Sequence, residues 1–319
     1  MLHYRESAQI DRAAWDACVQ QAGRTAYGFS WYLDLVSEHW GGLVYGNYDA
    51  VFPLPWKQRA GLRWVYTPFF CQQLGVFARH PEAPGKSAVP ATGEWLRAIP
   101  RRFRKVDLAV GGTKGALPLE APLTLPDGWS STERPNFALD LSLEADALRT
   151  NYETNTRRNL KKAQAAGLLT DKNLAPAELL ALIREHQGPK LPALGKQEYN
   201  RILAIMEQAL SRGLGTMIRA FDPATPDTAQ AGAFFLHAPR GPLYLFGTTT
   251  PAARQNGAMT LVFDALIVQK SGQHGVFLDF EGSAIPGLAR FYQGFGAAQE
   301  PYHTLHMRRF PLLFKGFGR

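Results

Sequence analysis

The stretch FLDFEGSAIPGLARFYQGFGAAQEPY, residues 277–302, carries the strongest structural signal in the chain. Residues 276–280 predict a buried strand, and Pro286 opens a predicted helix that reaches residue 295. Asp279 and Glu281 stand two residues apart at the exit of that strand, so both side chains lie on one face. A carboxylate there can take a proton from an attacking amine, or it can cap the following turn.

The segment before this stretch predicts a strand, a polar loop and a strongly apolar helix. The loop is TTTPAARQNGA (248–258), and the helix begins MTLVFDALIVQ (259–269). Arg254, Asn256 and Gly257 stand where the loop enters the helix. Peptide N–H groups and the positive end of a helix dipole suit a pyrophosphate, so this loop is a candidate anion site. The alternative is an ordinary polar loop.

A basic helix is predicted further upstream, in NYETNTRRNLKKAQAAGL (151–168). Ser142 is placed to cap it, and Gly167 ends it. One face predicts a buried stripe, made by Leu148, Tyr152, Leu160 and Ala163.

The cations of this helix divide into two pairs. Arg157 and Lys161 lie one turn apart beside the stripe, whereas Arg158 and Lys162 point away from it. The first pair is expected to border a cleft. Tyr152 and Asn155 are expected to add hydrogen bonds to a phosphate or a peptide carboxylate.

The remaining pattern predicts an α+β fold in two parts, residues 1–134 and 135–319. The first part begins with helices capped by Asp11 and Ser30, followed by an antiparallel meander. Its other predicted elements are a helix from 92, a strand at 106–110 and a linker at 111–134. The second part adds a strand at 136, helices at 176–188 and 196–212, strands at 216–221, 231–237 and 243–248, and a final strand at 302–308. A tail at 309–319 has room to pack back on the first part.

Composition narrows the class of protein. The 319 residues are 45% hydrophobic and 19% charged, which excludes a fully disordered or fibrous chain. The formal net charge is +8, so the average field attracts anions. Cys18 and Cys71 are expected to be buried free thiols, and neither a signal peptide nor a membrane span is predicted. A cytoplasmic location is therefore expected.

Two apparent motifs fail. Gly85-Lys86-Ser87 resembles the end of a P-loop, but His80 stands where the first glycine is required. His303 and His306 fall on opposite faces of a predicted strand, without a cluster of other metal ligands. We therefore expect no metal.

With these motifs in place, the chain resembles the FemAB-like branch of the GNAT acyltransferase superfamily. The resemblance rests on residues 151–168 and 277–302, and on KQRAGLRWVYTPFFCQQLGVF (57–77). It implies two tandem GNAT-like domains, each a mixed, mostly antiparallel sheet flanked by helices. It also implies transfer of an acyl or aminoacyl group to an amine, from acyl-coenzyme A or from aminoacyl-tRNA.

The resemblance also suggests roles for individual residues. Glu281 is the first candidate for the base and Asp279 the second, while Tyr292 is placed to protonate the leaving group. The predicted donor loop comprises Arg254, Gln255, Asn256, Gly257 and Ala258. Met259 departs from the small residue that a coenzyme A loop has at that position.

Three functions stay open at this point. We expect an N-acyltransferase acting on an amino group of an anionic small molecule or cell-envelope precursor, with acyl-coenzyme A as donor. An aminoacyl-tRNA-dependent transferase and a non-catalytic anion-binding protein are the alternatives. The active cleft is expected between the domains, with Gln72 and Gln73 on alternate faces of a strand and one amide turned towards the other domain.

Overall fold

The computed structural model describes the chain except residues 24, 80–88, 112–123, 192, 283–284 and 310–319. The P-loop-like Gly85-Lys86-Ser87 and the tail beyond Arg309 lie outside the described residues. The chain forms two compact units. One comprises Met1–Pro135 and the segment from Glu300 onward, and the other comprises Asn136–Gln299.

The first unit contains a sheet with the strand order β1-β2-β3-β4-β6-β15-β7, and β5 pairs with β3. Its neighbouring strands are antiparallel except β4 and β6, which are parallel. This confirms the predicted meander. The strands are β1 (Leu2–Glu6), β2 (His39–Tyr45), β3 (Ala50–Arg59), β4 (Leu62–Tyr66), β5 (Phe77–Ala78), β6 (Phe103–Val110), β7 (Trp129–Arg134) and β15 (Tyr302–Arg308).

Helices cover both faces of this sheet. They are α1 (Arg12–Gln21), α2 (Ser30–Val36) and α3 (Thr92–Ala98). The ring of Trp15 in α1 lies where a side chain on Gly42 would be, and the ring of Trp95 in α3 packs edge-on against Phe52. Gly42 and Phe52 belong to opposite faces, because Phe52 pairs with the residue next to Gly42. The sheet is therefore a central layer.

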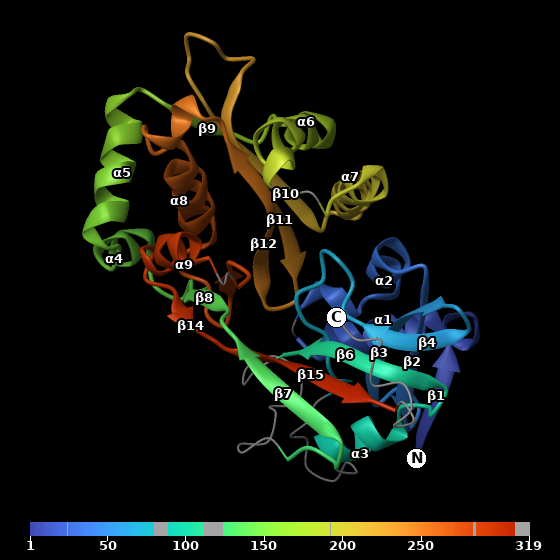
Figure 1. Cartoon of the computed structure of the whole chain (residues 1–319). Helices are drawn as coiled ribbons and strands as arrows, with labels where there is room; N and C mark the ends of the chain where they lie inside the picture. The colour runs from blue at the N-terminus through green and yellow to red at the C-terminus, as the bar shows by residue number, and fades with distance from the viewer. Residues whose placement is uncertain (24, 80–88, 112–123, 192, 283–284, 310–319) are drawn as a thin grey trace. The chain divides into compact units, whose positions relative to one another are not determined.

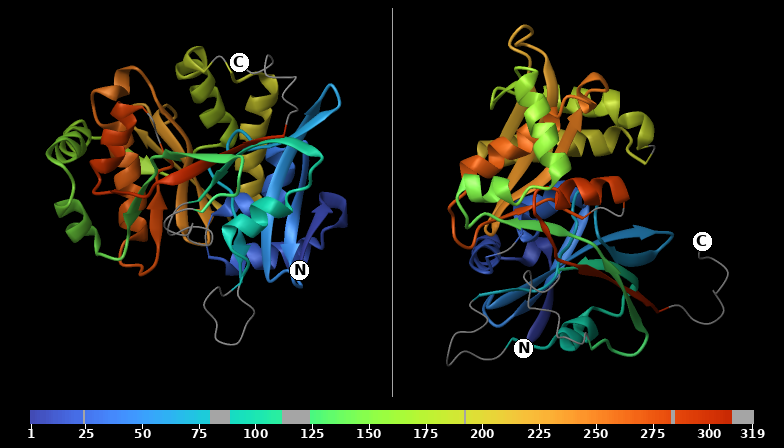
Figure 2. Two further views of the ribbon diagram at one scale, coloured as in Figure 1. Left: turned by 60° about the horizontal axis from the view of Figure 1, so that its bottom comes forward. Right: turned by 90° about the vertical axis from the view of Figure 1, so that its left-hand side faces the viewer.

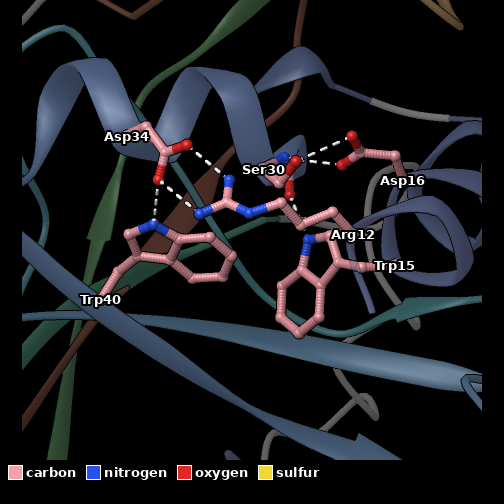
Figure 3. A network of polar contacts seen from close by, with 7 residues as sticks. Arg12, Trp15, Asp16, Ser30, Asp34 and Trp40 are labelled. Carbon is pink, nitrogen blue, oxygen red and sulfur yellow. Dashed lines mark hydrogen bonds and ion pairs between the residues drawn. The ribbon is translucent and has the colours of Figure 1, made fainter. Parts of the chain in front are cut away.

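A polar network fastens α1 to α2 (Figure 3). Both Asp16 carboxylate oxygens accept from Ser30, one from its N–H at 2.7 Å and one from its hydroxyl at 2.8 Å. Ser30 is thus the first residue of α2 and not its cap, which corrects the prediction. Asp34 in turn accepts hydrogen bonds from Arg12 and from the Trp40 indole. These contacts fix the angle between the two helices.

The second unit contains a sheet with the strand order β14-β8-β13-β12-β11-β10-β9. Only β12 and β13 are parallel among its described pairs, and α8 crosses between them. Its strands are β8 (Phe137–Asp140), β9 (Leu169–Asp171), β10 (Gly215–Phe221), β11 (Ala229–Ala238), β12 (Gly241–Thr249), β13 (Phe277–Asp279) and β14 (Ala298–Gln299).

Two layers of helices enclose this second sheet (Figure 1). The helices α6 (Pro176–His186) and α7 (Lys196–Ser211) cover one face, where Leu179 lies against Gly232. The other face is covered by α4 (Ala145–Thr150), α5 (Thr154–Ala165), α8 (Ala258–Lys270) and α9 (Pro286–Gln293). Figure 2 shows the same layers from other sides. The second unit therefore matches the predicted α+β class.

The predicted single helix capped by Ser142 is instead the pair α4 and α5. Its continuity breaks after Thr150, and the N–H of Glu153 donates to the carbonyl of Gly294 at 2.8 Å. The residue before α4 is Glu144, so Ser142 caps neither helix. The four residues of the predicted stripe are all buried, because both helices face the same core.

The final strand changes the predicted domain boundary. The expected second domain, 135–319, includes β15, but β15 lies between β6 and β7 in the first unit's sheet. Its Leu305 is fully buried there, which explains the pairing. The predicted linker at 111–134 likewise contains β7, the other neighbour of β15. The first unit thus needs a strand from the far end of the chain.

Two further expectations can be compared with the described residues. Cys18 and Cys71 are buried free thiols, as predicted. None of the helices in the described part of the chain has the length and apolar character that a membrane span requires.

Candidate functional site

Strands β12 and β13 diverge in the second unit. Their described pairing consists of Leu243 opposite Asp279. Strand β12 continues to Thr249, whereas β13 ends at Asp279. The register between β11 and β12 also shifts, since Phe234 faces Phe246 and Phe235 faces Tyr244. A bulge next to such a divergence redirects side chains and leaves strand edge available to a ligand.

Glu281 follows β13 in a left-handed backbone conformation, with φ at 60°. Residues with a Cβ rarely adopt that conformation without support from neighbours. Here the N–H of Glu281 donates to Asp279 Oδ1 at 2.9 Å, and Asn136 Nδ2 donates to the same oxygen at 3.1 Å. Asp279 therefore holds the turn, which is the alternative that the sequence left open for this residue.

An aromatic cluster lies beneath this turn. The Phe280 ring is fully buried and lies 5.1 Å from the Tyr292 ring and 5.3 Å from the Phe263 ring. Burial is the main cause that raises the pKa of Tyr292, and the charges of Tyr244 and Glu281 raise it further. The phenol of Tyr292 is therefore protonated at neutral pH, and it lies within electrostatic reach of Glu281.

The loop before α8 is closed by its own contacts. Gly257 has a φ of 80°, and a Cβ there would overlap the main-chain oxygen of Asn159 in α5. Ala258, the first residue of α8, donates its N–H to Asn256 Oδ1 at 3.1 Å. The Asn256 amide donates in turn to Gln230 at 2.6 Å. Of the predicted loop residues, only Arg254 and Gln255 are exposed.

The four cations of α5 share one surface. A pocket of about 520 Å³ is lined by Thr154, Arg157, Arg158, Lys161, Lys162 and Ala165. We call these six residues the α5 basic face. Within the described residues none of its cations forms an ion pair. The predicted division into two pairs is therefore wrong.

The members of the α5 basic face are not equally engaged. Arg157 donates to the carbonyl oxygens of Thr150 and Tyr152, at the end of α4. Arg158 donates to Asn155 Oδ1 at 2.7 Å, which uses one of the polar groups predicted to bind substrate. Lys161 and Lys162 are exposed, with no hydrogen bond to the described residues. The two lysines are thus the most available cations of this face.

Three predicted substrate contacts have other roles. Tyr152 is buried, and its hydroxyl donates to Asp264 at 3.1 Å instead of facing a ligand. Gln72 and Gln73 lie in an irregular segment and not in a strand. Gln73 Nε2 donates to Gln72 Oε1 at 2.9 Å, so the two amides meet instead of pointing to opposite faces.

The sequence analysis missed a buried polar cluster around Asp264. This carboxylate is 3% exposed and accepts two hydrogen bonds from Arg149, at 3.0 and 2.6 Å. Together with Tyr152 it ties α4 to α8. The available signal was a single carboxylate in the apolar helix 259–269, because buried charges in proteins are paired. No group of three or more possible metal ligands is present among the described residues.

Comparison with known proteins identifies the fold. No protein-family model and no curated protein matches the chain. The structure of FemX is 13% identical, with a TM-score of 0.63, over 94% of this chain and 96% of FemX. L-PGS from Bacillus licheniformis is 12% identical, with a TM-score of 0.56, over 94% of this chain and 92% of that one.

A third structure extends the comparison. It is the tandem GNAT protein from the clavulanic acid biosynthesis pathway, 13% identical with a TM-score of 0.52 over 98% of this chain and 99% of that protein. The chain therefore has the FemAB-like fold, with two GNAT-like domains in tandem. At these identities the likeness concerns the fold.

Proposed function

We propose that the protein is an N-acyltransferase that forms an amide on an amino group of an anionic small molecule or cell-envelope precursor. The observation that carries this proposal is the left-handed turn at Glu281, next to the divergence of β12 and β13 and above the protonated Tyr292. A strained residue held by specific contacts supports a functional role. The fold shared with FemX and a tandem GNAT protein supports the same class of reaction.

The proposed step divides its work among three groups. The amine nitrogen attacks the acyl carbon, and Glu281 takes the proton that the nitrogen loses. Peptide N–H groups on the edge of β12 beyond Leu243 stabilise the oxyanion. The bond between the acyl carbon and its carrier then breaks, and Tyr292 protonates the leaving sulfur or oxygen.

The donor is proposed to be an acyl group on a phosphate-bearing carrier. The closed contacts of Asn256, Gly257 and Ala258 disfavour the loop before α8 as the phosphate site. The unpaired cations of the α5 basic face support that surface instead. Acyl-coenzyme A and aminoacyl-tRNA both carry such phosphates, so the donor remains a choice between them.

Thermal unfolding with candidate donors distinguishes these possibilities. The intact protein is heated with acetyl-coenzyme A, longer acyl-coenzymes A or aminoacylated tRNA, each at low and moderate salt. A ligand at 100 times its Kd adds about 2.7 kcal/mol to the free energy of unfolding. Stabilisation by tRNA that fades steeply with salt supports the aminoacyl-transfer alternative, because bound phosphates release counterions. Stabilisation by an acyl-coenzyme A supports the first choice.

A non-catalytic anion-binding protein is the second candidate function. The α5 basic face favours it, since that face is complete without Glu281. Both candidates predict thermal stabilisation by anions, but only the transferase predicts an amide product. Binding without product in the presence of amine acceptors therefore supports the second candidate.

A further inference from the structure

We infer that Asn136 is a positioning residue that acts through Asp279 to hold Glu281 in its left-handed conformation. Asn136 is 2% exposed and comes directly before β8. The catalytic meaning of this inference rests on the proposed function. Its mechanical part, the link from Asn136 to the backbone of Glu281, stands on the contacts alone.

The main chain fixes both ends of this link. Asp279 pairs with Ala138 in the antiparallel ladder of β13 and β8. The N–H of Phe280 donates to the carbonyl of Phe137 at 2.9 Å. Asn136 and Asp279 therefore belong to one rigid pair of strands, and their side chains meet without a mobile loop between them.

The side chains then transmit this rigidity to Glu281. Asp279 Oδ1 accepts from Asn136 Nδ2 at 3.1 Å and from the N–H of Glu281 at 2.9 Å. Because one oxygen receives both hydrogen bonds, the Asn136 amide fixes the carboxylate in the rotamer that supports the turn. Without the amide the carboxylate is free to rotate, and the backbone of Glu281 can relax to negative φ. Such a change would move the Glu281 carboxylate away from Tyr292.

A double-mutant cycle tests the mechanical link without any substrate. Glycine adopts positive φ without strain, so E281G removes the need for support. We expect N136A to lower the Tm of the wild-type chain by more than it lowers the Tm of E281G. The matched control is T216V, which removes a buried hydrogen bond to His237 elsewhere in the same unit. The effect of T216V on Tm is expected to be the same with and without E281G.

A kinetic measurement tests the positioning role. With any acceptor that the wild-type enzyme acylates, N136A is expected to lower kcat at least 10-fold with KM within twofold of wild type. A group that only stabilises the fold would leave the kcat of the folded fraction unchanged. Asp279→Asn keeps an oxygen acceptor for both hydrogen bonds and is expected to retain more activity than N136A.

The outcomes separate this inference from the proposed function. Additive Tm changes for N136A and E281G overturn the inference, whatever the enzyme does. Coupled Tm changes with wild-type kcat in N136A also overturn the positioning role, provided that E281Q is inactive. Coupled Tm changes together with full activity of E281Q support the mechanical link and contradict the proposed function alone.

Discussion

The main-chain oxygen of Asn159 occupies the space that a Cβ on Gly257 would need. Gly257 also has a φ of 80°, so two independent constraints exclude a larger residue. We expect Gly257→Ala to lower the free energy of unfolding by about 2–4 kcal/mol, from left-handed strain together with overpacking. Chemical denaturation measures this change.

Gly213 provides the matched control for that variant. It lies in the same unit with a φ of 68°, but open space surrounds its α-carbon. Gly213→Ala therefore introduces only the conformational strain, about 1–2 kcal/mol. Equal losses in the two variants would show that α5 does not pack tightly against the start of α8.

The α5 basic face gives a prediction about anion binding. We expect the double variant K161A/K162A to bind its phosphate-bearing ligand more weakly and with a salt dependence lower by about one to two contacts. Arg157 stays in place because it caps the end of α4. Isothermal titration across a salt series measures both quantities.

The control for this experiment is K172A/K196A, which removes the same charge from exposed positions outside α5. Because long-range attraction depends on net charge, this control accounts for the general field. Equal weakening in both double variants would show that the α5 basic face does not contact the ligand.

Strand β15 gives a prediction about stability. Leu305 is fully buried between β6 and β7. We expect Leu305→Ala to cost about 2–5 kcal/mol in the first unfolding transition, as for other buried leucines. Calorimetry on the full chain measures it. A loss below about 0.5 kcal/mol, typical of a surface site, would contradict the placement of β15 inside the first unit's sheet.

The ion pair between Asp171 and Arg219 gives a pH dependence. Asp171 accepts from Arg219 at 2.8 and 3.0 Å, and this pairing lowers the pKa of Asp171. A carboxylate with a lowered pKa stabilises the fold above its unfolded pKa of about 3.9, and this stabilisation is lost as pH falls through the folded pKa. The difference in stability between wild type and D171N should therefore be constant above about pH 5 and shrink below about pH 4.

An exposed carboxylate serves as the reference for this pH series. Glu207 is exposed in α7, so E207Q removes one negative charge without removing the pair. A D171N profile that is parallel to the wild-type profile from neutral to acidic pH would contradict a lowered pKa for Asp171.

Much of the second unit's architecture follows from local pattern. Strands β10 to β12 and helix α8 were predicted within a few residues because their apolar periodicity is strong. The break between α4 and α5 was not, since the buried stripe continues across it. The carbonyl that receives the N–H of Glu153 belongs to Gly294, which lies far along the sequence.

The pairing of β15 with β6 and β7 could not be predicted for the same reason. Its apolar face indicates a strand but does not name its neighbours. The candidate site shows this limit again. Asp279 and Glu281 are recognisable from their two-residue spacing, whereas Asn136 precedes Asp279 by 143 residues. Only the folded chain brings that amide to the carboxylate.

Amide formation tests the central proposal most directly. The intact protein is incubated with acyl-coenzymes A or aminoacylated tRNA and a set of anionic amine acceptors, and products are identified by mass spectrometry. We predict an amide product with the wild-type chain and a decrease in rate of about 10²–10⁴-fold in Glu281→Gln, the range that general base catalysis supplies. An unchanged rate in Glu281→Gln, or donor binding without any amide, would contradict the proposed transferase site.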